Sequence, residues 1–423
     1  MSCIKVFIFA VFWELFLHSL DACDKGWFGE RCQFKCHCQS DCDMEGQCVG
    51  DKPRCDYRWF GTTCQYQDLA TVNGTTITSN ARENTHWLTD RDAQTCNNDP
   101  GLESVLIVWN TEYWFTWMRI VMKSLAQFKS VDVQFNQNTS SQMLNCTKFT
   151  LNTSSPTLEI HCSLDFLVRQ ITIKSAADLC DIYISGGVDF ALKQMANQSS
   201  NYEGTEIASL AVDGNFNTWS HTENEDKPSL NVTLPNPRLV TRIVLYNRMY
   251  DGNNYPIGHR LQNFELKALD ENGDPQFRYK DNNSEPLHNY TVVIAGRTVI
   301  KIIVYATYKK PVITERPILT LVELQIFGEC LPGTWGLYCN QSCPSYCPVT
   351  CTQEEGSCHL IHEEECCDDV ASLEQYLSLT GSKNLLRIVQ GHKDVCQTLL
   401  QKKFRIKLKL CTIIHWQKQY MNQ

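Results

Sequence analysis

The chain has 423 residues, of which 43% are hydrophobic, and it carries a formal net charge of -9 with a pI near 5.7. This length accommodates about two or three domains. The acidic balance argues against nucleic acid as a partner, because a phosphate-binding surface needs an excess of basic residues.

The first 22 residues have the pattern of a secretory signal peptide. Lys5 precedes an apolar stretch, and the small residues Ser19 and Ala22 close it. The run is short for a membrane anchor, and no later segment has about 18 apolar residues without a charge. We therefore expect a secreted or extracellular chain with no membrane span beyond the signal, or a piece that ends before an anchor.

The cysteines support export. One of the 23 lies in the signal, and the other 22 fall in blocks of even size, as internal pairing requires. In an oxidising compartment this density predicts a disulfide framework. Nine N-x-S/T glycosylation sequons agree with that compartment: Asn73, Asn138, Asn145, Asn152, Asn197, Asn231, Asn282, Asn289 and Asn340.

Within the dense blocks a ten-residue unit recurs at 23–32, 55–64 and 330–339. In each copy eight residues separate two cysteines, with a Trp and a Gly at the middle. The unit has too little apolar content for a core, so disulfides must hold it. Residues 23–65 and 330–367 resemble the EGF-like modules of multiple-EGF and scavenger receptors. Most such modules are spacers, and the oxidising compartment disfavours zinc at Cys36, His37 and Cys38.

Two strand-rich segments, 66–187 and 188–329, lie between these modules. Each contains short apolar or alternating runs separated by Gly, Asn, Asp and Pro turns, which is typical of an all-β sandwich. The tail at 368–423 is different, and we expect a short helix or a poorly ordered terminus. Its basic and apolar alternation leaves a membrane-surface or partner-binding segment as the other interpretation.

The second segment contains the sequence NRMYDGNNYPIGHR between two strand-like runs, which predicts a long inter-strand loop with Arg248 and Arg260 at its ends. An Arg fork can hold a vicinal pair of oxygens, although most surface arginines are simply solvated. The segment also contains AVDGNFNTWSH and ends on ILTLVELQIFG. In this order the motifs resemble the discoidin and F-type lectin (fucolectin) superfamily of galactose-binding-like domains.

The resemblance implies an all-β fold with two tandem galactose-binding-like jelly-roll sandwiches between the EGF-like modules. It places fucose-type sugar contacts on His221, Arg248 and Arg260. The adjacent cysteine pair that packs on the sugar in this family is absent here, and Tyr250 and Tyr255 could replace it. The loop between Asp213 and His221 is shorter than in the family, which weakens the assignment of His221.

The family also implies a structural calcium ion under the binding loops. The side chains of Asp213 and Glu323 and the backbone carbonyls of Leu210, Asn215 and Val322 would coordinate it, and Ser220 fits less closely. The alternatives are that Asp213 is an ordinary turn residue and that Glu323 is a solvated charge on a strand.

The first sandwich looks like a degenerate copy. By resemblance, Cys96 pairs with Cys180 and Cys146 with Cys162, but the segments CNND and RIVMKSLAQ lack the His and the Arg pair of the site. Asp90 and Asp92 in the turn before Cys96 could bind a cation, but a simple turn is the better interpretation.

Together these features predict a secreted, calcium-stabilised lectin that binds fucose-containing glycans in recognition, innate immunity or adhesion. Because a single sugar site is weak, an oligomer is compatible with this function. The alternative is a non-lectin ectodomain, a fragment or isoform of a multi-EGF receptor that binds protein. We expect no enzyme, since HEEEC at 362–366 lacks the second His of a zinc protease.

Overall fold

The computed structural model describes residues 23–361, apart from short gaps at 52, 81–84, 98, 100, 125–130, 138–139, 146–147, 153–155, 175, 177, 308–315, 346, 348–349 and 359. The predicted signal, the HEEEC motif and the tail therefore lie outside the described residues. The chain divides into two compact units, and the boundary in the sequence lies between Gln65 and Tyr66. Among the described residues, no helix is long and apolar enough to cross a membrane.

The first unit is a small disulfide-bonded module. Its short strands form two hairpins, β1 (Trp27–Phe28) with β2 (Phe34–Lys35) and β3 (Asp41–Cys42) with β4 (Cys48–Val49). Disulfides link Cys23 to Cys32, Cys38 to Cys48 and Cys55 to Cys64. The first and third of these close the recurring ten-residue unit.

The third copy of the ten-residue repeat lies after the second sandwich, and a disulfide between Cys330 and Cys339 closes it in the same way. The central glycines Gly29, Gly61 and Gly336 all have a φ between 86° and 95°, a conformation that other residues rarely adopt. The prediction that disulfides hold this unit is therefore confirmed for all three copies.

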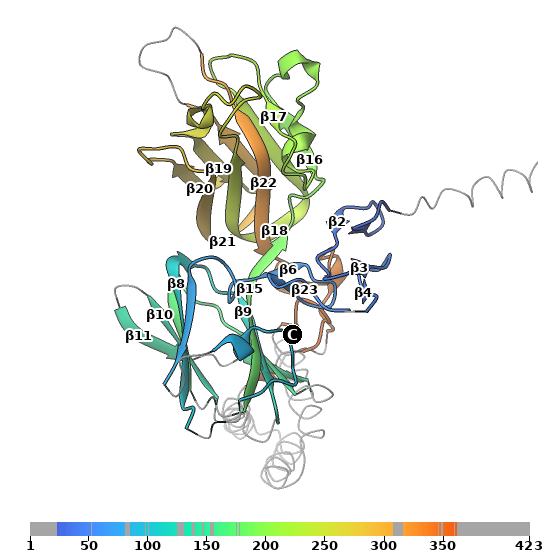
Figure 1. The fold of residues 1–423 in the computed structure, drawn as a ribbon, viewed down its shortest axis with the longest axis vertical. Helices are drawn as coiled ribbons and strands as arrows, with labels where there is room; N and C mark the ends of the chain where they lie inside the picture. Colours follow the sequence, from blue (N-terminus) through green and yellow to red (C-terminus); the bar gives the residue numbers. More distant parts are fainter. Residues whose placement is uncertain are drawn as a thin grey trace, which may run out of the picture. The chain divides into compact units, whose positions relative to one another are not determined.

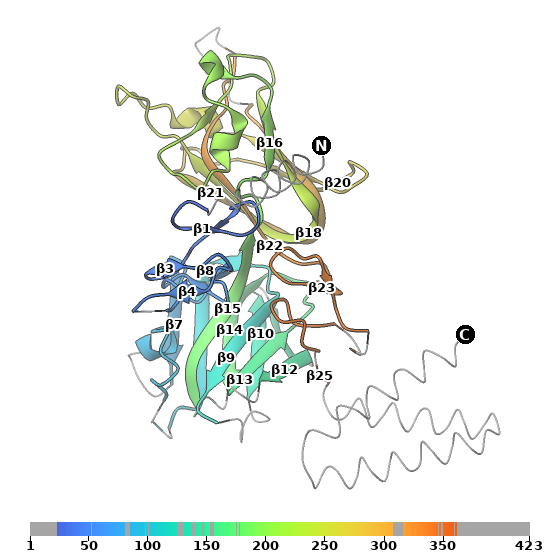
Figure 2. The same ribbon diagram turned by 90° about the vertical axis from the view of Figure 1, so that its right-hand side faces the viewer.

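The first sandwich has two facing layers. One is the sheet β11-β10-β14-β8-β7, and the other runs β15-β9-β13-β12-β25 (Figure 2). Its strands are β7 (Thr75–Ser79), β8 (Ser104–Tyr113), β9 (Trp117–Met122), β10 (Asp132–Gln137), β11 (Ser140–Asn145), β12 (Lys148–Asn152), β13 (Thr157–His161), β14 (Val168–Lys174), β15 (Leu179–Asp189) and β25 (Leu360–Ile361). Inward-facing residues such as Ile107, Ile120 and Ile171 are fully buried in the core between the layers.

The second sandwich is organised by two long strands, β18 (Ser229–Asn247) and β21 (Asn289–Tyr305), which pair along most of their length (Figure 1). Its other strands are β16 (Met195–Gln198), β17 (Ser220–His221), β19 (Glu265–Leu269), β20 (Pro275–Lys280) and β22 (Thr320–Glu329). Strand β18 continues through Pro235 and Pro237, because a register shift against β21 between Thr233 and Arg238 accommodates the two prolines.

Strand β18 pairs with different neighbours before and after this register shift. Its first half pairs with β16 and its second half pairs with β22. The second half ends at Asn247, directly before the predicted loop. The long strand therefore brings the Arg248 end of that loop next to β22, which carries Glu323.

Strand β15 links the two sandwiches. It pairs with β9 in the first, and its last residues, Val188 and Asp189, pair with β22 of the second. A Cβ on Gly187 of β15 would lie 2.6 Å from the backbone nitrogen and oxygen of Gly328 on β22, so the two strands approach closely here only because Gly187 has no side chain. At the same junction, the buried Glu329 accepts hydrogen bonds from Ser185 at 2.6 Å and Thr116 at 2.9 Å.

Candidate functional site

The loop that follows β18 is held at its base by the buried Asn247. Its side-chain amide donates to the carbonyls of Gly258 at 2.8 Å and Leu287 at 3.0 Å. A 3-10 helix, η5 (Gly258–Leu261), then carries Arg260. The predicted inter-strand loop is thus confirmed, and its two arginines lie on anchored backbone.

Arg260 contacts His221 directly. Nη1 of Arg260 lies 2.9 Å from Nε2 of His221, and Nδ1 of His221 lies 2.8 Å from the carbonyl oxygen of Thr222. A carbonyl can only accept, so Nδ1 carries the proton and Nε2 accepts from Arg260. His221 is only 5% exposed, and Tyr202 packs on its ring with the centroids 4.4 Å apart. Both ring nitrogens of His221 are therefore already engaged.

Arg248 lies over Trp219, with its guanidinium carbon 3.8 Å from the ring centroid. The indole N–H of Trp219 donates to Glu206 Oε1 at 2.8 Å, which fixes the ring. Glu206 also lies beside His221, with Oε2 4.0 Å from Nδ1. Among the described residues none accepts a hydrogen bond from the edge N–H groups of Arg248, so stacking restrains the guanidinium while its fork suits a ligand with paired oxygens.

The two arginines act on the same histidine. Burial, the Arg260 cation and, more weakly, Arg248 lower the pKa of His221 to about 4. Burial also lowers the pKa of Arg248, while Glu206 and Asp251 raise it. Arg248, His221 and Arg260 therefore form one cluster in which carboxylates offset the positive charge.

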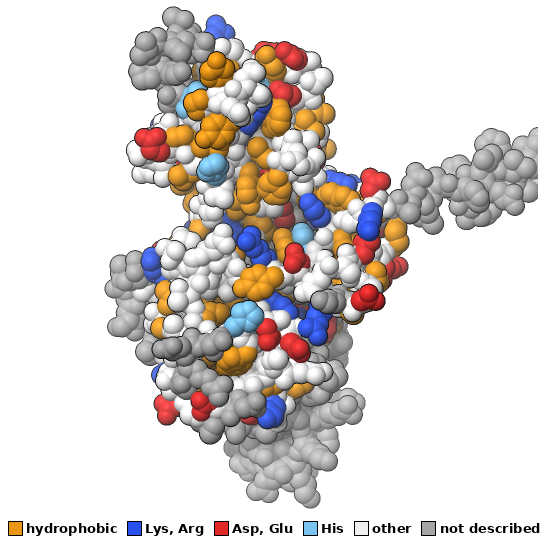
Figure 3. All heavy atoms as spheres, in the orientation of Figure 1, with side chains coloured by type: hydrophobic (Ala, Val, Ile, Leu, Met, Phe, Trp, Pro, Cys, Tyr) orange, Lys and Arg blue, Asp and Glu red, His pale blue; other side chains and the backbone are white. Residues whose placement is uncertain are grey.

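The tip of the loop presents two aromatic rings. Tyr250 and Pro256 form a bridge, and the Asp251 carboxylate accepts the backbone N–H groups of Asn253 at 2.8 Å and Tyr255 at 2.9 Å. In this tight turn Tyr250 is 56% exposed and Tyr255 is 67% exposed. The space-filling view shows other hydrophobic side chains on the visible face of the second sandwich (Figure 3).

The two carboxylates predicted to bind calcium lie on neighbouring segments, the turn at Asp213 and strand β22. Glu323, on β22, is buried, and its Oε1 accepts the N–H of Gly214 at 3.2 Å. The Asp213 carboxylate accepts from Asn215 N and Thr218 Oγ1, both at 2.8 Å. Asp213 is thus a turn residue in the structure, and Glu323 is not the solvated charge of the alternative interpretation.

The donor set at this turn fits calcium in kind, because it consists of oxygens with two carboxylates among them. Ser220 is buried on β17, opposite Leu321 of β22, and Val322 precedes Glu323. The carbonyl of Asn215 already accepts from Thr218 N at 3.2 Å and Oγ1 at 2.8 Å. Leu210 lies in the 3-10 helix η4 (Ala208–Ala211), which precedes the turn.

Three residues of the cluster, Tyr202, Glu206 and Trp219, were not assigned a role from the sequence. Tyr202 lies in the 3-10 helix η3 (Tyr202–Gly204), in a segment without strand or helix periodicity. Only Trp219 had a signal, as the aromatic residue that follows the Asp-Gly-Asn turn.

The disulfides predicted by resemblance in the first sandwich are partly testable. Cys96 is bonded to Cys180, as expected. Cys162 is also in a disulfide, but its expected partner, Cys146, lies outside the described residues. Asp90 and Asp92 form a tight turn, in which the Asp90 carboxylate accepts from Asp92 N at 2.9 Å and Thr95 Oγ1 at 2.7 Å.

Residues 210–304 match the family model of the NedA-like galactose-binding domain. The second sandwich therefore contains a galactose-binding-like domain, and the part of the chain that the structure describes is all-β, with jelly-roll sandwiches and small disulfide-bonded modules. No curated protein matches the chain.

Several solved structures are similar to parts of the chain. The lectin domain of lectinolysin, solved with Lewis b antigen, has 27% sequence identity and a TM-score of 0.30, over 33% of this chain and 96% of that one. A fucose-binding module from Streptococcus pneumoniae has 23% identity and a TM-score of 0.29, over 34% and 97%. A fucolectin from striped bass (Morone saxatilis) serum has 17% identity and a TM-score of 0.29, over 60% and 96%.

Proposed function

We propose that the second sandwich is a carbohydrate-binding domain that takes fucose-type glycans at the cluster of Arg248, His221 and Arg260. The observation that carries this proposal is the pair of restrained guanidinium groups, one stacked on Trp219 and one hydrogen-bonded to His221. Arg forks bind vicinal hydroxyls with charge-assisted hydrogen bonds, and the exposed tyrosines offer an apolar surface to a sugar ring.

The charges of the cluster favour a neutral ligand over an anion. Glu203 acts on His221, and Glu206 and Asp251 act on Arg248, so three carboxylates accompany two arginines. An anionic ligand would meet this negative field, whereas a sugar hydroxyl can donate to a carboxylate and accept from a guanidinium. We therefore place neutral sugars ahead of sulfated or sialylated ones.

In this proposal, His221 positions Arg260, and the sugar is bound mainly by the arginines and the aromatic residues. Charge-assisted bonds contribute about 1.5 to 3 kcal/mol each. Two such bonds from each of the two arginines would total about 6 to 12 kcal/mol, and ordering and desolvation costs would reduce this to roughly 4 to 6 kcal/mol, a dissociation constant from millimolar to tens of micromolar. Several copies of the site would then act together on a multivalent glycan.

We also propose that calcium braces the turn of Asp213 against Glu323 and that the protein acts outside the cell in glycan recognition or adhesion. The oxygen donor set supports the first statement. Seven disulfides between described cysteines support the second, because such bonds persist in oxidising compartments.

A glycan array probed with the full chain tests the proposal. We expect binding to fucose-containing glycans that free L-fucose competes, that salt affects little, and that a calcium chelator weakens. Arg260→Ala should strongly weaken the signal. Arg278→Ala is the matched control, because Arg278 is an exposed arginine on β20 of the same sandwich. An array without any glycan signal, or equal binding by both variants, would overturn it and favour a protein partner.

A further inference from the structure

Several positions of the two sandwiches can be matched from their hydrogen bonds. Asp68 Oδ1 accepts the N–H groups of Ala70 and Ile184, both at 2.9 Å, in the first sandwich. Asp189 Oδ1 accepts those of Ala191 and Ile326, both at 3.0 Å, in the second. Asp68 is thus equivalent to Asp189. Counting back three residues from Ile184 and Ile326 makes Asp181 equivalent to Glu323.

The turns that follow are equivalent as well. Asp90 accepts from the N–H two residues later and from the Thr hydroxyl five residues later, and Asp213 does the same. The next residue is Arg91 in the first sandwich and Gly214 in the second. Both have a left-handed backbone, with φ of 65° and 71°.

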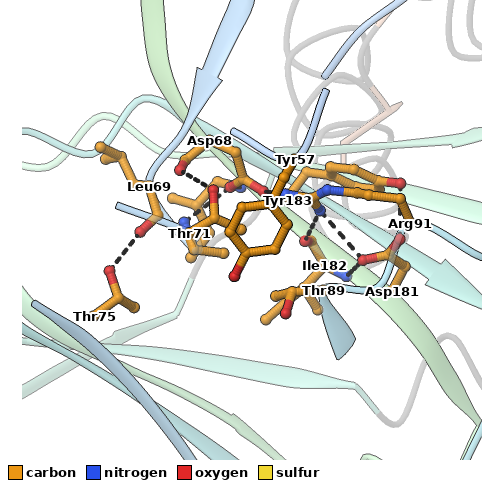
Figure 4. Close-up of polar contacts among 12 residues, drawn as sticks. Tyr57, Asp68, Leu69, Thr71, Thr75, Thr89, Arg91, Asp181, Ile182 and Tyr183 are labelled. Carbon is orange, nitrogen blue, oxygen red and sulfur yellow. Dashed lines mark hydrogen bonds and ion pairs between the residues drawn. The ribbon is translucent and has the colours of Figure 1, made fainter. Parts of the chain in front are cut away.

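The left-handed conformation suits Gly214 and disfavours Arg91, by roughly 1 kcal/mol for a residue with a Cβ. The Arg91 side chain therefore has to provide compensating contacts. It turns inward, where it forms ion pairs with Asp68 and with Asp181, the latter at 3.4 Å, and donates to the carbonyl of Ile182 at 3.3 Å (Figure 4).

These contacts are made inside the protein. Asp68 and Asp181 are fully buried, and the guanidinium carbon of Arg91 lies 4.5 Å from the ring centroid of Tyr183. Burial raises the pKa of Asp181 to about 7, and the Arg91 cation opposes this rise. Two buried carboxylates need a positive charge beside them to stay ionised. Arg91 supplies that charge from within the chain.

We propose that the Arg91 guanidinium takes the place of a divalent cation in the first sandwich, where it pairs with Asp68 and Asp181. A divalent cation is then needed only in the second sandwich, beside its ligand-binding loops. In the second sandwich the equivalent position is Gly214, which has no side chain, and Glu323 Oε1 accepts its backbone N–H at 3.2 Å where Asp181 meets the Arg91 guanidinium. The second half of this inference rests on the calcium site of the proposed function. The first half concerns Arg91 alone.

Calcium counting on the full chain by equilibrium dialysis tests the inference. We expect one calcium ion per wild-type chain and two per chain of Arg91→Gly, a substitution that the left-handed backbone accepts. The double variant Arg91→Gly with Asp181→Asn should return to one calcium ion per chain, and Arg91→Lys, which keeps the positive charge, should stay at one. Glu323→Gln should bind none.

Thermal unfolding of the same variants provides an independent readout. Calcium should raise the melting temperature of Arg91→Gly by more than it raises that of wild type. If Arg91→Gly binds no more calcium than wild type, or stays unfolded with calcium present, the inference is wrong. If wild type binds none and Arg91→Gly binds one, the role of Arg91 stands and the calcium of the proposed function fails.

Discussion

His221→Leu should weaken glycan binding although, in the proposed arrangement, His221 does not touch the sugar. The substitution removes the Nε2 acceptor that lies 2.9 Å from Arg260 Nη1. A hydrogen bond to a charged group contributes about 1.5 to 3 kcal/mol, which corresponds to about a 10- to 140-fold change in dissociation constant. Arg260 is only half-buried and can recruit water, so we expect the lower part of that range.

A double-mutant cycle with Arg260→Ala separates positioning from direct contact. If His221 acts through Arg260, the double variant binds no more weakly than Arg260→Ala alone, because the arginine that His221 positions is already gone. Calorimetric titration of each variant with a fucosylated oligosaccharide measures the binding free energies that the cycle compares. Additive losses in binding free energy would refute the positioning role and show that His221 contacts the sugar itself.

Folding and side-chain chemistry need their own controls in this experiment. His221→Leu also loses the hydrogen bond from Nδ1 to Thr222, which contributes about 1 kcal/mol to stability. The melting temperature should therefore fall slightly without loss of the fold. His221→Gln provides the matched control, because its amide oxygen can still accept from Arg260, and it should retain more of the affinity than His221→Leu.

Three further predictions concern the loop tip, the sandwich junction and the disulfide of the first sandwich. Tyr250→Ala and Tyr255→Ala should each weaken oligosaccharide binding by a few-fold, since a ring contact contributes about 0.5 to 1.5 kcal/mol, while leaving the melting temperature nearly unchanged. Burial raises the pKa of Glu329 to about 7 from an ordinary 4.5, so the folded state holds this proton more tightly than the unfolded chain does, and its contribution to stability falls as the pH rises from about 4.5 through 7. Glu329→Gln should therefore stabilise the protein at pH 8 relative to wild type, by up to about 3 kcal/mol, with little effect at pH 4. Replacing Cys96 and Cys180 by serine opens a link between residues 84 positions apart and should lower the free energy of unfolding by about 2 to 5 kcal/mol.

Each of these predictions has a clear contrary result. A large drop in melting temperature for either tyrosine variant would show that the rings support the fold. A Glu329→Gln variant that is less stable than wild type at pH 8, in denaturant unfolding, would show that the ionised carboxylate is well accommodated at the junction. Unchanged denaturant unfolding after loss of the Cys96 disulfide would mean that the first sandwich does not need it.

Local pattern in the sequence determined much of the architecture. The apolar or alternating runs SVLIVWN from residue 104 and VRQITIKS from residue 168 correspond to strands β8 and β14, because successive side chains of a strand point to opposite faces and the order of apolar residues shows this two-residue period. The repeated cysteine spacing predicted loops held by disulfides, and all three ten-residue units are closed in that way. Short strands such as β16 and β17 were missed, since two to four residues carry too little periodicity to detect.

The candidate site shows the limit of local pattern. The sequence placed Arg248 and Arg260 on one loop and His221 on another, and resemblance grouped them as ligands. Only the tertiary structure shows that His221 is buried with both ring nitrogens engaged and that Trp219 stacks on Arg248. It also shows that Glu206 contacts both Trp219 and His221.

The same holds for Arg91, which in sequence is one charged residue in a turn. Its partners, Asp68 and Asp181, lie 23 and 90 residues away along the chain. Such roles depend on distances between segments that are remote in sequence. Composition and periodicity determine which strands form, and the packing of those strands determines which charges meet.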